Sequence, residues 1–274
     1  MMSERSYSFS SYLDRLLSKG RLVLTPERAQ EDLGISRRAF IDAAKRQQNR
    51  GNLIMPRRGF YVIVPPQYLA LGAPPPSFYI DSLMRHEGCP YYVGLLKAAE
   101  HHGATHQAVM QYQVITDKRL PNIRAGRSLI VFYYRKDMGE IAGGLQEYKT
   151  EAGFIKVSGP ELTMLDLLRY RHATAGLDNI ATVLSDLGPQ IIPGKLASLA
   201  TAFERTVVQR LGYMLDDLGF ADQAEPLHAI LNETGPLPWT ALEPIGARDR
   251  AAQRAFAERN ERWHVTVSRV PEID

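Results

Sequence analysis

The chain of 274 residues lacks the sequence signatures of several large protein classes. Cys89 is the single cysteine, so no intrachain disulfide can form, and we expect a structural thiol in a reducing compartment. No apolar run approaches the roughly 20 residues of a membrane span, and the N-terminus has no apolar signal core, which predicts a cytoplasmic protein with no membrane partner. Glycine-rich nucleotide loops and the G-x-S-x-G elbow of hydrolases are missing as well. We therefore expect neither catalysis nor a bound cofactor.

Positive charge is concentrated near the N-terminus. The whole chain carries +3, yet residues 1–64 contain 12 Lys or Arg and 6 Asp or Glu, a net of +6, which leaves −3 for the remainder. A local excess of positive charge favours a polyanionic partner. The asymmetry predicts nucleic-acid binding by the N-terminal part alone.

Residues 25–64 have the order of a winged helix-turn-helix, in which two short helices precede a two-stranded hairpin. Thr25 followed by Pro26 is typical of a helix start, and Gly34 can end that helix with a positive φ. Ser36 then caps the second helix. The alternative interpretation is a helical hairpin whose basic face is simply solvated.

The second helix, expected over residues 37–50, has two unlike sides at about 100° per residue. Small and apolar side chains centre on the side assigned to the core: Ala39, Phe40, Ile41, Ala43 and Ala44. Polar and charged side chains share the opposite side: Arg38, Asp42, Lys45, Arg46 and Asn49. The polar side, flanked by Arg37, is predicted to face DNA, and Asp42 is expected to orient its neighbouring arginines.

A hairpin follows, with strands expected over residues 52–55 and 60–64 and a tip at Pro56-Arg57-Arg58-Gly59. Two guanidinium groups are expected to project from this tip into the minor groove or along its phosphates. The predicted DNA-binding set is Thr25, Ser36, Arg37, Arg38, Lys45, Arg46, Asn49, Arg57 and Arg58. One winged helix reads only a short half-site, so two copies, a homodimer on the DNA, are expected on one operator.

The order of helix and strand patterns predicts an α+β protein with an N-terminal winged helix-turn-helix followed by a larger α+β domain. We expect the DNA-binding domain over 1–66, a stiff Pro-rich linker over 67–77, and a second domain over 78–274, whose part 78–158 is α+β and whose part 159–274 is mainly helical. Helical patterns cover 10–19, 78–87, 93–102, 160–170, 180–187 and 195–218, where Gly212 is expected to bend or divide the last helix. Strand patterns cover 21–24, 111–116, 128–135, 154–157 and 263–267.

Two sets of residues suggest chemistry. His101, His102 and His106 are spaced closely enough to suggest a metal site, but Gly103 interrupts the helix and no carboxylate or thiolate accompanies them, so no metal is expected. Asp137, Glu147 and Lys149 have the order found in Mg²⁺-dependent nucleases, with a loose gap. A nuclease therefore stays as an alternative, and a ligand-responsive one-component regulator is another.

Several motifs resemble those of the AbiEi antitoxins of type IV toxin–antitoxin systems. They are the hairpin end Arg58 to Pro66, the segments Pro90 to Ala99, His102 to Gln107 and Val157 to Leu167, and the stretch Gln209 to Leu215. The resemblance covers roughly Leu13 to Leu218 and weakens from about Glu225.

This resemblance implies a non-enzymatic antitoxin with two functions, in a system associated with phage defence. The winged helix would repress the protein's own operon by binding inverted repeats in double-stranded DNA. The remainder would counteract an AbiEii-like toxin, which is similar to a nucleotidyltransferase, without forming a stable complex with it. On this view the histidines and tyrosines of residues 90–107 are scaffold.

Overall fold

The structure, a computed structural model, describes residues 8–105, 108–233, 235–243 and 258–273. Its chain contacts divide into two units. The first contains the residues up to Tyr91 together with Met110–Tyr134 and Glu147–Lys156, and the second contains Tyr92–Val109, Arg135–Gln146 and the residues from Val157 onward. The domain boundaries expected from composition stay a prediction, because contacts group the residues differently. None of the described helices combines the length and the apolar content that crossing a membrane requires.

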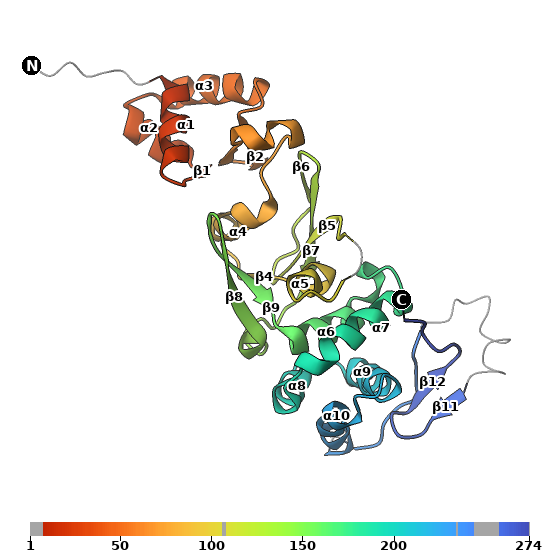
Figure 1. Ribbon diagram of the computed structural model, residues 1–274. Helices are drawn as coiled ribbons and strands as arrows, with labels where there is room; N and C mark the ends of the chain where they lie inside the picture. Colours follow the sequence, from red (N-terminus) through yellow and green to blue (C-terminus); the bar gives the residue numbers. More distant parts are fainter. Residues whose placement is uncertain (1–7, 106–107, 234, 244–257, 274) are drawn as a thin grey trace, which may run out of the picture. The chain divides into compact units, whose positions relative to one another are not determined.

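The first unit begins with a winged helix-turn-helix, as predicted (Figure 1). Helices α1 (Phe9–Ser18), α2 (Pro26–Leu33) and α3 (Arg37–Asn49) pack with an antiparallel sheet of order β1 (Val23–Leu24), β3 (Phe60–Ile63) and β2 (Leu53–Arg57). Tyr12, Leu16, Phe40 and Leu53 belong to its common core, and the Phe40 ring meets Tyr61 edge-on at 5.4 Å. Edge-on contacts of this kind are favourable between buried aromatic rings.

Local chemistry explains where these helices begin and end. Pro26 occupies the first turn of α2, Gly34 follows it with φ +61°, and the Ser36 hydroxyl accepts a hydrogen bond from the Ala39 amide at 3.2 Å. The helix expected over residues 10–19 begins one residue earlier, at Phe9. Ser8 caps this helix and accepts from the Ser11 amide.

The segment expected to be a linker packs against the first unit. It forms two 3₁₀ helices, η1 (Pro66–Leu71) and η2 (Pro76–Phe78), between which Ala73 and Pro74 are buried. Gly126 approaches this segment so closely that a Cβ there would lie 2.1 Å from the Leu71 carbonyl oxygen. The proline-rich stretch is therefore held by tertiary contacts as well as by its own stiffness.

A mixed sheet of six strands has the order β6-β7-β5-β4-β9-β8. Its strands are β4 (Tyr91–Val93), β5 (Gln111–Thr116), β6 (Ile123–Ala125), β7 (Ser128–Tyr134), β8 (Leu145–Thr150) and β9 (Gly153–Ser158). The apolar run at 129–134 lies in β7, which pairs with β5 in parallel and with β6 in antiparallel orientation, so its prediction as an interior strand is confirmed. The short strands β4, β6 and β8 were missed because none carries an alternating or apolar run long enough to signal a strand.

Helices dominate the rest of the chain. They are α4 (Ile80–Glu87), α5 (Leu95–His101), α6 (Pro160–Arg169), α7 (Leu177–Leu187), α8 (Pro193–Ala200), α9 (Arg205–Asp217) and α10 (Ala221–Glu233), with short 3₁₀ turns η3 (Ala142–Gly144), η4 (Arg171–Ala173) and η5 (Gly188–Gln190). A small sheet of β10 (Thr240–Ala241), β12 (Val265–Val267) and β11 (Glu258–Asn260) completes the second unit.

The long helix expected over 195–218 is broken, but not at Gly212. The break lies between α8 and α9, whereas Gly212 is inside α9 and makes room for the buried Trp263, whose ring would lie 2.1 Å from a Cβ at that position. The Trp263 indole N–H also donates to the Asp216 carboxylate at 2.7 Å. The glycine thus serves packing between α9 and the C-terminal strands.

A polar network is buried inside the second unit. Asp166 is fully buried in α6, accepts a hydrogen bond from the Tyr92 hydroxyl at 2.7 Å and lies 3.6 Å from the Arg135 guanidinium. Arg135 is 1% exposed, donates to the Ala202 carbonyl at 2.9 Å and stacks over Phe203. Burial raises the pKa of the Asp166 carboxyl to about 7, although the Tyr92 hydrogen bond and the Arg135 charge act in the opposite direction.

This pKa predicts how stability depends on pH. The folded value of about 7 exceeds the ordinary 3.8, so the folded state binds the proton more tightly and the Asp166 contribution to the free energy of unfolding falls as pH rises from about 4 to about 7. Asp166→Asn should therefore flatten the decline of the melting temperature between pH 5 and pH 8.

Two further variants complete the measurement. Asp166→Ala leaves the buried Arg135 charge without its carboxylate and should cost about 3 kcal/mol or more of unfolding free energy. The exposed Asp14→Asn is the control and should melt as the wild type does. A melting profile for Asp166→Asn that parallels the wild type at every pH would contradict the assignment.

Candidate nucleic-acid interface

Helix α3 presents a basic surface to solvent. Phe40, Ala43, Ala44 and Gln47 are buried on its inner side. The predicted DNA-facing side chains are all exposed: Arg37, Arg38, Lys45, Arg46 and Asn49. The Arg38 side chain is 86% exposed, and its Nε donates to the Asp42 carboxylate at 3.1 Å. Asp42 therefore orients Arg38, as the sequence suggested, and its negative charge is offset there.

Two residues that were assigned to the inner side of α3 are exposed. Ala39 faces solvent, and the Ile41 side chain is 45% exposed, so the apolar side of the helix is narrower than predicted. At about 100° per residue Ile41 lies roughly 100° from Phe40 but only about 40° from Lys45. Ile41 is apolar, but its position around the helix axis places it with the basic side chains.

The two predicted residues at helix starts differ in their contacts. The Ser36 hydroxyl is exposed and already accepts the Ala39 amide, so it acts as a helix cap. Thr25 precedes α2 with extended backbone but makes no side-chain cap hydrogen bond. Their predicted part in DNA binding stays a prediction.

The tip of the wing is shorter than expected. Strand β2 continues through Arg57, and the turn consists of Arg58 and Gly59, the latter with φ +78°. The Arg58 side chain is exposed, while its carbonyl oxygen accepts from His86 Nε2 at 3.2 Å. The His86 ring also lies 5.3 Å from Phe60. Helix α4 therefore supports the tip from one side.

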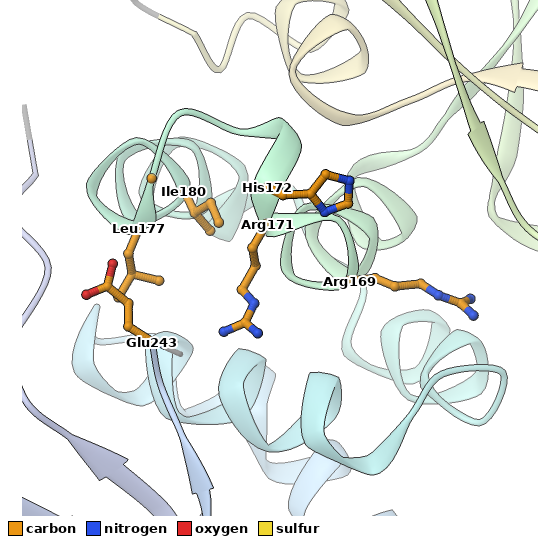
Figure 2. A pocket seen from close by; sticks show the side chains of 7 residues that line it. Arg169, Arg171, His172, Leu177, Ile180 and Glu243 are labelled. Atoms are coloured by element: carbon orange, nitrogen blue, oxygen red, sulfur yellow. The ribbon is translucent and has the colours of Figure 1, made fainter. Parts of the chain in front are cut away.

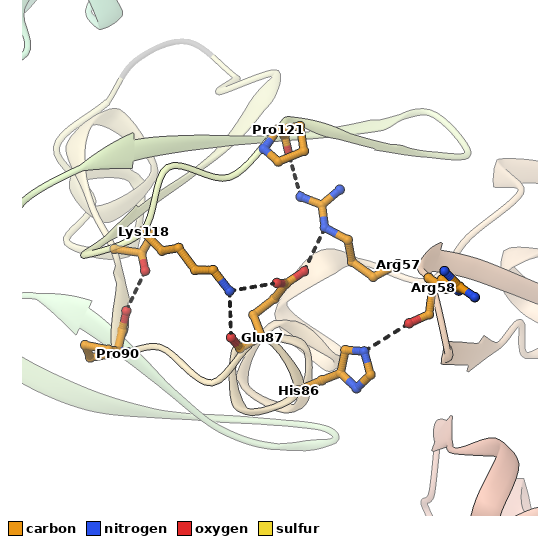
Figure 3. A network of polar contacts seen from close by, with 8 residues as sticks. Arg57, Arg58, His86, Glu87, Pro90, Lys118 and Pro121 are labelled. Atoms are coloured by element: carbon orange, nitrogen blue, oxygen red, sulfur yellow. Dashed lines mark hydrogen bonds and ion pairs between the residues drawn. The ribbon is translucent and has the colours of Figure 1, made fainter.

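Arg57 does not project from the wing, so this part of the prediction is wrong. Its Nε donates to Glu87 Oε1 at 2.9 Å, another of its nitrogens donates to the Pro121 carbonyl, and its guanidinium lies 5.7 Å from the Phe132 ring centroid. The Arg57 and Glu87 side chains are only 18% and 15% exposed. Figure 3 shows Arg57 turned toward Glu87, with the Arg58 side chain outside this network. Arg57 is an anchor of the wing, and Arg58 is its exposed cation.

Arginines that the sequence analysis missed lie beside the wing. Strand β6 packs against β2, and Arg124 and Arg127 flank the glycine turn between β6 and β7, both of them exposed. Among the described residues neither has a recorded ion pair, while the nearby Arg119 stacks over Tyr134 at 4.6 Å. The spacing Arg-x-x-Arg around Gly126 was the available signal, and it was lost because this strand was not predicted.

The structure also places the residues of the suggested metal site and of the nuclease alternative. His102 Nε2 lies 2.7 Å from the Ser158 carbonyl oxygen, burial lowers the pKa of that imidazole, and His106 lies outside the described residues. Asp137, Glu147 and Lys149 are exposed, the last two on β8. Within the described part of the chain, no three His, Cys, Asp or Glu side chains gather as metal ligands would.

A cavity of about 310 Å³ lies in the second unit (Figure 2). Its lining contains Arg169, Arg171, His172, Gly176, Leu177, Ile180 and Glu243. Arg171 donates to the Leu242 carbonyl at 2.9 Å, and burial lowers the pKa of its guanidinium. The Arg169 charge is paired with Glu204 at 2.8 Å. The cavity thus combines apolar walls with the partly buried Arg171 cation and the Glu243 carboxylate.

Comparisons with known proteins agree with the motifs. Residues 92–217 match the family model of the AbiEi antitoxin C-terminal domain, so the recognised resemblance is confirmed over this stretch. The chain is also similar in structure to the Rv2827c protein from Mycobacterium tuberculosis, with a TM-score of 0.69, 17% identity, and coverage of 94% of this chain and 90% of that one. At this identity the likeness concerns the fold. No curated protein matches the chain.

The two wing arginines should respond differently to substitution. Arg58→Ala should weaken DNA binding severalfold with an unchanged melting temperature, because it removes an exposed cation. Arg57→Ala should lower the free energy of unfolding by about 1–3 kcal/mol, because Glu87 loses its closer cationic partner in a largely buried position. Denaturant unfolding and anisotropy titrations measure the two effects, and Glu87→Gln should reproduce part of the loss of stability. An Arg57→Ala protein of full stability and weak DNA binding would contradict its role as an anchor.

Proposed function

We propose that this chain is the antitoxin of a toxin–antitoxin pair and that its winged helix also binds DNA to repress its own operon. One observation carries the proposal. A winged helix with an exposed basic α3 and residues 92–217 that match an AbiEi antitoxin domain occur in the same chain. The first feature supports regulation, and the second implies a cognate toxin.

The DNA-binding part follows from the arrangement of α3. Its 13 residues would be about 20 Å long, a length that fits the major groove. Arg38, Lys45 and Asn49 share its outer side, where arginine suits guanine, asparagine suits adenine and lysine suits phosphate. Arg58 would contact the backbone or the minor groove, and Arg46 and Arg37 would flank the helix. Thr25 and Ser36, at the starts of α2 and α3, would contact phosphates through nearby backbone amides.

The wider assembly follows from symmetry and from the family. Two copies on inverted repeats of the promoter, a homodimer on the DNA, would extend a short half-site into a specific operator. The partner would be an AbiEii-like, nucleotidyltransferase-like toxin that is counteracted without a stable complex, as in type IV systems. The protein itself would catalyse nothing and would act in the cytoplasm.

A ligand-responsive regulator is the second candidate because of the cavity near Arg171. A small molecule that filled it would raise the melting temperature and change operator affinity together. If neither quantity responds to phosphorylated or carboxylated metabolites, this candidate loses its support.

Salt dependence tests the DNA-binding part. If about six phosphates are neutralised, log K should fall against log salt with a slope near −5, and Lys45→Ala should reduce that slope by about 1. Anisotropy titrations of the full chain on its own promoter duplex measure this. Lys156→Ala, which changes an exposed lysine outside the winged helix, is the matched control and should leave the slope unaltered. A slope near zero for the wild type would remove DNA from the proposal.

A growth assay tests the antitoxin part. The adjacent open reading frame is induced from an unrelated promoter, with or without the full chain that carries Arg38→Ala and Lys45→Ala, so that repression cannot mimic rescue. The full chain is used because Met110–Tyr134 and Glu147–Lys156 group with the winged helix in one unit, and a truncation would cut through it. We expect the variant to restore growth. If toxicity persists although the variant is present in soluble form, the antitoxin function is contradicted and only the repressor function remains proposed.

A further inference from the structure

Helix α3 exposes one large apolar side chain in the middle of its basic surface. Ile41 is 45% exposed, and among the described residues of this helix it is the only large hydrophobic one that faces solvent. The core of the winged helix is complete without it, since Phe40 and Ala44 supply the inward contacts of α3. Ile41 belongs neither to the buried core of the winged helix nor to the partly buried side chains packed against that core.

The neighbours of Ile41 restrict what could cover it. Arg37 and Lys45 lie one turn before and after it, Arg38 lies three residues before it, and all three are exposed. The centres of protein–protein interfaces are depleted of charged residues, so a protein partner fits this surrounding poorly. Double-stranded DNA fits it well, because the cations would meet phosphates and acceptor atoms while the apolar group would meet a methyl group in the major groove.

We propose that Ile41 recognises thymine by packing against its C5-methyl group in the major groove. This inference rests on the proposed DNA-binding function and adds a specificity-determining residue to it. The thymine methyl is the apolar group that bases present on the major-groove edge, and proteins recognise it by contact with apolar side chains. Ile41 is also the fifth residue of α3, within the N-terminal half that approaches base edges in helix-turn-helix proteins.

Different residues of the helix would position it on the DNA and distinguish the bases. Arg38, held by Asp42, and Lys45 flank Ile41 and can fix its position through hydrogen bonds and phosphate contacts. The methyl contact would then distinguish thymine from cytosine, which presents no methyl group there. Loss of one buried methyl contact is expected to weaken binding about fourfold per half-site.

The experiment removes the methyl group from the DNA and the side chain from the protein. A duplex is selected from a random pool by the full-length chain, and each thymine is then replaced singly by deoxyuridine, which keeps base pairing and lacks only the methyl group. We expect one thymine in each half-site at which deoxyuridine weakens binding about fourfold. Ile41→Ala should weaken binding to the thymine duplex by a similar factor and should be insensitive to deoxyuridine at that position.

Two variants serve as controls. Ile41→Val keeps most of the contact and should retain the sensitivity to deoxyuridine. Met55→Ala removes a similarly exposed apolar side chain, 44% exposed on β2, and should retain it as well. Because the side chain at position 41 is outside the core, all variants should melt close to the wild type. The deoxyuridine scan of the wild type decides the question even if one variant fails to fold.

Several outcomes would overturn the inference, and they differ from a failure of the proposed function. If no duplex is selected, DNA binding itself fails and the inference fails with it. If duplexes bind with the expected salt slope but no deoxyuridine substitution weakens binding, only the thymine contact fails. The same holds if Ile41→Ala weakens binding to the thymine and deoxyuridine duplexes equally. If Ile41→Ala instead abolishes a dimer in sedimentation measurements without DNA, Ile41 contacts a second copy of the chain.

Discussion

The carboxyl group of Asp166 has no access to water, and residues of the second unit surround it with polar and charged partners. Its two partners come from distant places in the sequence, the Tyr92 hydroxyl from β4 and the Arg135 guanidinium from the segment after β7. Arg135 in turn reaches Ala202 and stacks on Phe203, between α8 and α9. Burial outweighs these contacts and keeps the carboxyl pKa high. A buried network of this kind makes misplacement of any one segment costly, since an unpaired charge would remain.

In the first unit an arginine has the corresponding role. Arg57 ties the end of β2 to Glu87 in α4 and to Pro121 before β6, and Lys118 approaches the same carboxylate at 3.8 Å. The wing is therefore fixed by charge as well as by its hairpin register. Fixing the wing leaves Arg58 exposed at its tip and brings the arginines of the β6–β7 hairpin close to β2. A DNA surface built this way would be preformed, which reduces the cost of ordering side chains on binding.

The two proposed functions place different demands on the molecule. Reading DNA needs exposed cations on a rigid helix, with Ile41 as an apolar contact between them. The proposed counteraction of a toxin would involve residues that match the AbiEi domain, over 92–217, which belong to both units. Asp166, Tyr92 and Arg135 are almost completely buried, so we assign this network to stability and not to the antitoxin surface.

Features that depend on neighbouring residues could be predicted from the sequence. The start of α2 at Pro26, its end at Gly34 and the Ser36 cap followed from backbone chemistry, and the order of helices and hairpin then predicted the winged helix. The resemblance to AbiEi antitoxins likewise needed only linear motifs. Tertiary structure decided the rest. It turned Arg57 inward toward Glu87, packed the proline-rich segment under Gly126, moved the helix break away from Gly212 and left Ile41 exposed. These features depend on partners that are distant in the sequence. Patterns among neighbouring residues do not reveal which distant residues will meet.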